Sequence, residues 1–209
     1  MLPLRCCKCQ RLPLRPHHLF QAPPPRATPA CRFRMSDAFV AESPGGSSNA
    51  VHVTAIMASA ARAVAIEKFG INGQGRGVID RMIAGDDAIA VASASVSAAR
   101  LARMALRTWI IDRWLLHTSR SCTQVVVIGA GLDSRCMCLP LPHATRIFEL
   151  DLPVVINMKS HLLSFSSSYF RPVLRVPCDL SLPSWAQHLQ EAGFQSRQCT
   201  AWLCEGTAM

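Results

Sequence analysis

The second half of the chain contains four short, largely apolar runs, separated by segments with helical patterning. The first run, 124–129, reads QVVVIG and has the β-branched pattern of a strand that is buried on both faces. Further strands are expected at 146–151, 172–177 and 200–205, and helices between them at about 153–164 and 183–192. Strands that alternate with helices at this spacing predict an α/β fold with a parallel sheet and crossover helices.

An Ala-rich helical region is expected to precede the sheet. A helix can begin at Ser47 or Ser48, because both residues are good N-caps, and can run to about Phe69. The glycine-rich stretch 70–77 is expected to be a loop. The next stretch, 86–117, is Ala-rich at first and amphipathic afterwards, and it accommodates one or two helices.

The net charge of +9 is concentrated in the first 36 residues, which hold seven Arg or Lys, no Asp or Glu, and seven of the 14 prolines. This composition predicts a disordered basic tail over 1–46, followed by one domain over 47–209. Three readings of the tail stay open: a plastid or mitochondrial transit peptide, an untranslated stretch before a true start at Met35, and a functional basic arm. A transit peptide would make the protein organellar; otherwise we expect it to be cytoplasmic.

The residues after position 36 carry 15 basic and 13 acidic side chains, a net charge of only +2. We therefore expect no nucleic-acid partner, because nucleic-acid binding needs a clustered basic face. We also expect no membrane span, since the candidate stretch 88–99 has 12 uncharged residues where about 20 apolar ones are needed. The sequence leaves the oligomeric state open.

Six cysteines lie in the body of the chain, and they form no C-x-x-C pair of the kind that binds zinc. Cys136 and Cys138 are too close in sequence for a good tetrahedral site, so no metal site is predicted. We expect these six thiols to be reduced and partly buried, where they behave as small apolar residues.

A candidate ligand site follows the first predicted strand. Gly129-Ala-Gly131 lies at its carboxyl end, where α/β sheets bind ligands and where glycine lets a backbone approach a ligand closely. Asp151 follows Gly129 by 22 residues, the spacing at which a carboxylate reaches the ribose hydroxyls of an adenosine cofactor. The plainer alternatives are a tight turn for the glycines and a helix N-cap for Asp151. Glu149 is expected to have a structural role.

The cofactor could be NAD or S-adenosylmethionine. A dinucleotide-binding fingerprint has a third glycine, which would lie near position 134, but the chain has Ser134, preceded by Asp133. A carboxylate would repel a pyrophosphate, whereas S-adenosylmethionine has no phosphate and carries cationic groups. The residues therefore favour the methyl donor, with an NAD-dependent oxidoreductase as the weaker alternative.

Several blocks of the sequence resemble one family. Gln124 to Arg135, QVVVIGAGLDSR, is similar to a signature of the leucine carboxyl methyltransferase-like family of S-adenosylmethionine-dependent methyltransferases. The details, especially the block at Thr200–Gly206, look closer to the bacterial-type small-molecule branch of the family than to its phosphatase-modifying enzymes. Further blocks occur in the family's order: Arg107–Asp112, Phe148–Pro153, Lys159, Val176–Leu180 with Trp185, Leu189 and Gly193-Phe194, and Thr200–Gly206. The resemblance implies a Rossmann-like class I methyltransferase fold.

The resemblance also implies roles for individual residues. Arg107 would clamp the methionine carboxylate, for which a guanidinium fork is suited. Gly129 and Gly131 would let the loop pass beside the methionine and ribose. Asp151 would bind the ribose hydroxyls.

At the remaining positions, Asp179 would accept the adenine amino group and Leu180 would lie beside the ring. Glu205 would lie near the methionine ammonium and the methyl acceptor. Each polar residue has a plainer alternative: Arg107 as a solvated helix cation, Asp179 as a turn residue, and Glu205 as a surface residue.

The implied reaction is methyl transfer to an oxygen of a small molecule or of a protein C-terminus. A carboxylate acceptor needs no general base, whereas a hydroxyl does. The family continues beyond Glu205-Gly206, so we expect a domain that is truncated at its C-terminus, with weak cofactor binding and poor turnover. The alternative is a catalytically inactive truncated paralogue that acts as a binding or interaction module.

Overall fold

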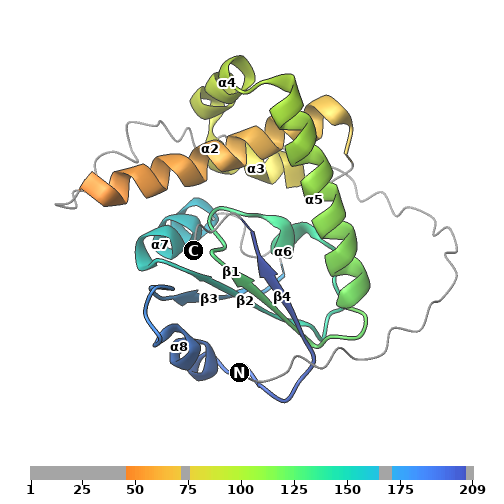
Figure 1. Ribbon diagram of the computed structural model, residues 1–209, viewed down its shortest axis with the longest axis vertical. Helices are drawn as coiled ribbons and strands as arrows, with labels where there is room; N and C mark the ends of the chain where they lie inside the picture. The colour runs from red at the N-terminus through yellow and green to blue at the C-terminus, as the bar shows by residue number, and fades with distance from the viewer. Residues whose placement is uncertain (1–45, 72–75, 165–170, 206–209) are drawn as a thin grey trace, which may run out of the picture. The chain divides into compact units, whose positions relative to one another are not determined.

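Four parallel strands form one sheet with the order β3-β2-β1-β4 (Figure 1). Their bounds are Gln124–Ile128 for β1, Arg146–Asp151 for β2, Leu174–Pro177 for β3 and Thr200–Cys204 for β4. In the register, Gln124 is paired with Arg146 on one side and Thr200 on the other. The four expected strands and their parallel pairing are confirmed, and with them the α/β fold class.

This computed structural model describes residues 46–71, 76–164 and 171–205. All of them lie in one compact unit of the chain. The predicted tail lies outside the described residues except for Gly46, which begins the first described helix, and residues 206–209 lie outside them as well.

Seven helices surround the sheet within the described part of the chain. The bounds are Gly46–Phe69 for α2, Arg76–Ala84 for α3, Asp86–Ser95 for α4, Ala98–Thr118 for α5, Arg135–Cys138 for α6, Pro153–Leu162 for α7 and Trp185–Glu191 for α8. α7 connects β2 to β3 and α8 connects β3 to β4, as expected for crossover helices. Figure 1 shows α2 to α5 and α7 on one side of the sheet and α8 on the other.

The two faces of the sheet pack against different helices. On one face, Val126 and Phe148 pack with Leu189 of α8. On the other face, Val125 packs in a cluster with Leu115 of α5. Successive residues of β1 thus enter different cores, as the two-residue period of a strand requires, and both faces are covered.

The alanines of α2 explain its central place in the helical layer. Ala60 and Ala63 pack in a cluster with α3 and α4, while Ala61 and Ala65 pack with Leu101 of α5. Small side chains on two faces let neighbouring helices approach α2 closely. The expected Ala-rich helical region is confirmed, with α2 ending at Phe69 before Gly70, whose φ is +60°.

The sequence predicts a loop over 70–77, and this is wrong at its end. α3 begins at Arg76, and a Cβ on Gly77 would lie 3.1 Å from Cγ2 of Ile66 in α2. Gly77 therefore permits close helix packing rather than a turn. α3 is not predicted by the sequence, because two of its buried side chains, Arg76 and Asp80, are charged and resemble solvated loop residues.

The stretch 86–117 folds as two helices, α4 and α5. Ser97 lies between them and caps α5 by accepting a hydrogen bond from the backbone N–H of Arg100 at 3.3 Å. Among the helices that the structure describes, none by itself is long and apolar enough to cross a bilayer. α4 and α5 reach that threshold only when taken together, and they are bent by 117°.

Candidate functional site

The loop after β1 turns through two glycines in the left-handed region. Gly129 has a φ of +65° and Gly131 a φ of +50°, which other residues adopt only at a cost. The backbone N–H of Gly131 donates to Oδ2 of Asp151 at 2.7 Å, and that of Ala130 donates to the carbonyl of Leu150 at 3.0 Å. A Cβ on Gly131 would have no neighbour within 4 Å, so the loop is fastened to β2 while one side of it stays open.

Asp151 uses both carboxylate oxygens to hold this turn. Oδ1 accepts the backbone N–H of Leu152 at 2.7 Å, opposite the bond from Gly131 to Oδ2. The N-cap of α7 is Leu152 and has no side-chain cap, so the helix-cap alternative for Asp151 is not what the structure shows. Each carboxylate oxygen has a second lone pair, which leaves acceptor capacity for a ligand hydroxyl.

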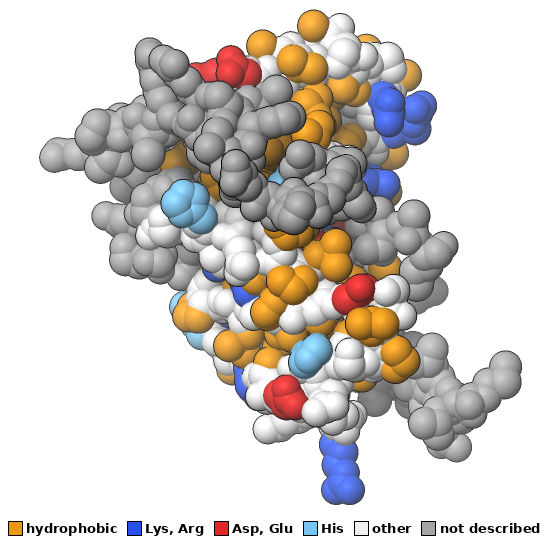
Figure 2. All heavy atoms as spheres, turned by 90° about the vertical axis from the view of Figure 1, so that its left-hand side faces the viewer, with side chains coloured by type: hydrophobic (Ala, Val, Ile, Leu, Met, Phe, Trp, Pro, Cys, Tyr) orange, Lys and Arg blue, Asp and Glu red, His pale blue; other side chains and the backbone are white. Residues whose placement is uncertain are grey.

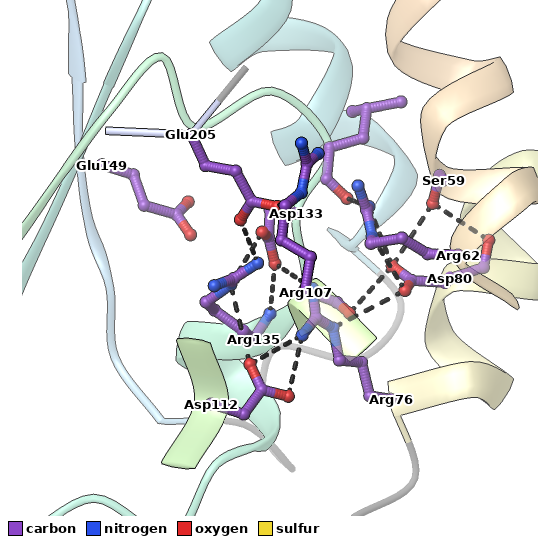
Figure 3. A network of polar contacts seen from close by, with 12 residues as sticks. Ser59, Arg62, Arg76, Asp80, Arg107, Asp112, Asp133, Arg135, Glu149 and Glu205 are labelled. Carbon is purple, nitrogen blue, oxygen red and sulfur yellow. Dashed lines mark hydrogen bonds and ion pairs between the residues drawn. The ribbon is translucent and has the colours of Figure 1, made fainter. Parts of the chain in front are cut away.

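Arg107 and Glu205 come from α5 and the end of β4, and the structure brings them together (Figure 3). Arg107 Nε lies 2.8 Å from Glu205 Oε1, and Arg135 Nη2 contacts Glu205 Oε2. The Arg107 side chain is 56% exposed, whereas that of Arg135 is 1% exposed. Glu205 is thus a bridge between an open and a buried guanidinium, so its surface-residue alternative does not describe it.

Asp133 is the centre of a buried charge network. Its carboxylate binds Arg135 through the backbone N–H and Nε, both at 2.8 Å, and Arg76 Nη2 at 2.9 Å. Burial would raise the pKa of Asp133, but Arg135, Arg76 and Arg62 outweigh burial and hold that pKa well below its usual range. Asp133 therefore stays ionised inside the protein.

Arg76 pairs with three carboxylates of the network, those of Asp80, Asp112 and Asp133. Its Nη1 binds both carboxylate oxygens of Asp112 in α5, at 2.8 and 2.9 Å, and its side chain is fully buried. Burial alone would lower the pKa of Arg76, but Asp133, Asp112 and Asp80 raise it. For Asp112, burial is the larger effect, and its pKa is raised despite Arg76 and Arg135. Arg76 thus joins α3 to α5 and to the loop after β1.

A second part of the network ties α2 to the same loop. Arg62 Nε and Nη2 bind the two oxygens of Asp80 at 3.1 Å each, and Nη2 also donates to the carbonyl of Leu132 at 3.1 Å. The hydroxyl of Ser134 donates to Asp80 Oδ1 at 2.9 Å. The described Lys and Arg side chains on the face drawn in Figure 2 are scattered, whereas Arg76 and Arg135 are fully buried and Arg62 is only slightly exposed.

These pairings change the reason for disfavouring a dinucleotide. The sequence suggests that Asp133 would repel a pyrophosphate, but Arg76 and Arg135 compensate its charge. The structure supplies another reason, because α6 has only four residues. So short a helix offers little of the aligned backbone dipole that binds a pyrophosphate.

Glu149 and Lys159 form a separate buried pair beneath the loop. Lys159 Nζ lies 2.7 Å from Glu149 Oε2 and donates to the carbonyl of Asp133 at 2.7 Å. Both side chains are at most 1% exposed. Glu149 therefore has the structural role predicted for it.

Asp179 and Leu180 follow β3 and lie next to the end of β2. The backbone N–H of Cys178 donates to the carbonyl of Asp151 at 2.8 Å, which fixes this neighbourhood. Asp179 is exposed, and its Oδ1 accepts the hydroxyl and the backbone N–H of Ser181 at 2.7 and 2.9 Å. These bonds lower the pKa of Asp179. Asp179 therefore stabilises the turn that follows β3. Leu180 packs against the core on the α8 side.

The seven residues assigned to a cofactor therefore share one edge of the sheet: Asp151 ends β2, five others follow the carboxyl ends of strands, and Arg107 reaches Glu205 from α5. Sequence reasoning missed the supporting charges Arg62, Arg76 and Asp80. Asp112 and Arg135 lie within the blocks that resemble the family, but the sequence predicted no role for them. The one signal that could have found some of them is a charged residue inside an otherwise apolar stretch, as at Asp80 and Asp112; Arg76, which lies between glycines, gives no such signal.

Comparison with known proteins gives the family. The family model for leucine carboxyl methyltransferase matches residues 71–209. A protein of Mycobacterium ulcerans (strain Agy99), named "Putative S-adenosyl-L-methionine-dependent methyltransferase", is 41% identical over 105 residues, which cover 49% of this chain and 33% of that protein. Proteins with the same name from Mycobacterium tuberculosis (strain ATCC 25177 / H37Ra) and Mycobacterium sp. (strain KMS) are each 40% identical, over 49% and 54% of this chain and 33% and 38% of their own lengths.

The chain thus aligns with about a third of the length of the curated relatives that it matches. The family match is broader, because it includes α3, the four described strands and the charge network except for Arg62. By this match over well more than half of its residues, the chain belongs to the leucine carboxyl methyltransferase family.

Proposed function

We propose that this chain binds S-adenosylmethionine and contributes to the transfer of its methyl group to an oxygen atom. The observation that carries the proposal is the turn at Gly129–Gly131, which the carboxylate of Asp151 holds at the carboxyl edge of the sheet. The names of the mycobacterial relatives support the choice of cofactor.

The residues present fit the adenosine part of this cofactor. The open side of Gly131 would be filled by a Cβ, so glycine there keeps space for a ligand. Asp151 is already fixed by two backbone N–H groups and would accept the ribose hydroxyls without moving. Asp179 would accept the adenine amino group through the oxygen that does not bind Ser181, and Leu180 would offer an apolar contact to the ring.

The residues at the other end of the site fit the methionine part. When bound, S-adenosylmethionine supplies an activated methyl group on a cationic sulfur. Arg107 has five N–H donors and can bind a carboxylate while its Nε still binds Glu205. Glu205, held by Arg107 and Arg135, would place a negative charge near the methionine ammonium.

For the acceptor we propose a carboxylate or hydroxyl oxygen, on a small molecule or on a protein C-terminus. A carboxylate acceptor is ionised at neutral pH and requires only alignment with the methyl group. A hydroxyl acceptor requires a base, and Glu205, for which the family resemblance implies a place near the acceptor, would be the candidate.

Calorimetric titration of the full chain with S-adenosylmethionine, S-adenosylhomocysteine and NAD tests the proposal. We expect the first two ligands to bind and NAD to bind far more weakly or not at all. Asp151→Asn should weaken binding of both sulfur ligands, whereas Asp87→Asn, an exposed position in α4, should not. Equal binding of NAD, or an Asp151→Asn variant with unchanged affinity, would show that the site is wrongly assigned.

A further inference from the structure

Two cysteines meet at the edge of the sheet opposite the proposed site. Cys122 precedes β1 and Cys199 precedes β4, and their Sγ atoms are 2.7 Å apart although 77 residues separate them in sequence. Cys122 is 6% exposed, whereas Cys199 is exposed to solvent. A formed disulfide has an S–S distance of about 2.05 Å, so bond formation requires an approach of only about 0.7 Å.

The surrounding backbone holds the two thiols in this position. The N–H groups of Thr123 and Gln124 both donate to the carbonyl of Cys199, at 3.1 and 3.3 Å. The hydroxyl of Thr123 donates to Oε1 of Gln198 at 2.8 Å. The side-chain amide of Gln124 exchanges two hydrogen bonds with the backbone of Gln195, both at 2.9 Å, and Gln124 is fully buried. The pair is therefore preorganised by the chain on both sides of it.

We propose that Cys122 and Cys199 form a redox-active dithiol, which closes to an intramolecular disulfide by exchange with a low-molecular-weight disulfide such as glutathione disulfide. The exposed Cys199 thiolate attacks one sulfur of the oxidant, forms a mixed disulfide and releases one glutathione thiolate. The Cys122 thiolate then attacks Cys199 Sγ and releases the second glutathione. The two cysteines lose two electrons and two protons, and the oxidant gains them as two glutathione thiols.

Other described cysteines compete poorly for the oxidant. Burial raises the pKa of the Cys136 thiol well above its usual range, that of Cys138 to about 12, and that of Cys178 above its ordinary value. Because the thiolate is the reactive form, these three thiols should react slowly. Cys204 is exposed and can react with the oxidant, but it ends β4 at the opposite edge of the sheet from Cys199, too far away to close a disulfide with either member of the pair.

Closing this disulfide would lock β4 to β1. Among the described strands, β4 pairs only with β1, and Glu205 follows its far end. A covalent link at the start of β4 would oppose the separation of β4 from β1. It would thereby also oppose the movement of the other end of β4, which precedes Glu205, away from β1.

The test uses the full chain in glutathione buffers of increasing oxidised fraction, with thiol alkylation and peptide mass mapping. We expect a Cys122–Cys199 cross-linked peptide as the main disulfide product of the native protein, 2 Da lighter than the reduced pair. The Cys204→Ser variant should form it equally well, and Cys199→Ser should not form it. In 6 M guanidinium chloride the preference for this pair should disappear. Hydrogen exchange of the β4 amides should be slower in the oxidised protein.

Three results would overturn the proposal: a persistent glutathione adduct on Cys199 without closure, a product distribution like that of the denatured chain, or equal formation of disulfides that involve Cys204. If the β4 amides exchange equally fast in both forms, the inferred locking of β4 is wrong. None of these outcomes depends on cofactor binding, so the proposed methyltransferase function is tested separately.

Discussion

Replacing Arg76 with methionine should remove the central cation of the buried charge network. Asp133 would keep Arg135, and Asp80 would keep Arg62, but Asp112 would keep only Arg135 Nε, at 3.8 Å. Loss of one partner from a buried ion pair costs about 3–5 kcal/mol. Asp112 can limit this cost by taking up a proton, and its pKa, already raised by burial, should rise further.

The same helix provides a matched control. Arg81 in α3 pairs with Glu67 at 2.6 Å, but the two side chains are 42% and 71% exposed. Exposed ion pairs contribute about 0–1 kcal/mol, so Arg81→Met should cost less than about 1 kcal/mol. Both variants remove one guanidinium from α3 and differ mainly in burial.

Urea denaturation followed by circular dichroism measures the difference. With an m-value of about 2 kcal/mol per M, the midpoint of Arg76→Met should fall by about 1.5–2.5 M and that of Arg81→Met by less than about 0.5 M. Adding Asp112→Asn to Arg76→Met should recover part of the loss, because it removes the unpaired charge. Equal midpoints for the two single variants would refute the reasoning that burial makes Arg76 essential.

Three further predictions concern the loop and its charges. Asp151→Asn should weaken S-adenosylmethionine binding about tenfold or more in calorimetry, since charge-assisted hydrogen bonds contribute roughly 1.5–3 kcal/mol each. The variant should also be less stable in urea denaturation, because its amide nitrogen cannot accept one of the two backbone N–H bonds. Gly131→Ala should cost about 1–2 kcal/mol, measured by urea denaturation, because its φ of +50° is strained for alanine although no clash arises. The pKa of Asp133 is depressed in the folded state, so its carboxylate stabilises the fold at pH values above its unfolded pKa of about 4. The urea midpoints of the parent protein and of Asp133→Asn should therefore converge as the pH falls below about 4, and a gap that stays constant would contradict this.

The strands and the central glycine turn could be predicted from sequence because their signals are local. A β-branched run such as 124–128 identifies a buried strand, and alternation with helices then restricts the pairing to parallel. The 22-residue spacing from Gly129 to Asp151 follows from the βαβ connection, so it placed that carboxylate beside the loop correctly.

The charge network and the thiol pair were decided only by the tertiary structure. Arg76 meets Asp112 and Asp133 across 36 and 57 residues, Arg135 meets Glu205 across 70, and Cys122 meets Cys199 across 77. No local period connects such positions, and a charged residue next to glycines has the same pattern whether it is solvated or buried. Burial becomes possible only when helices from three parts of the chain converge on one loop, because each charge then has a partner that offsets the cost of its desolvation.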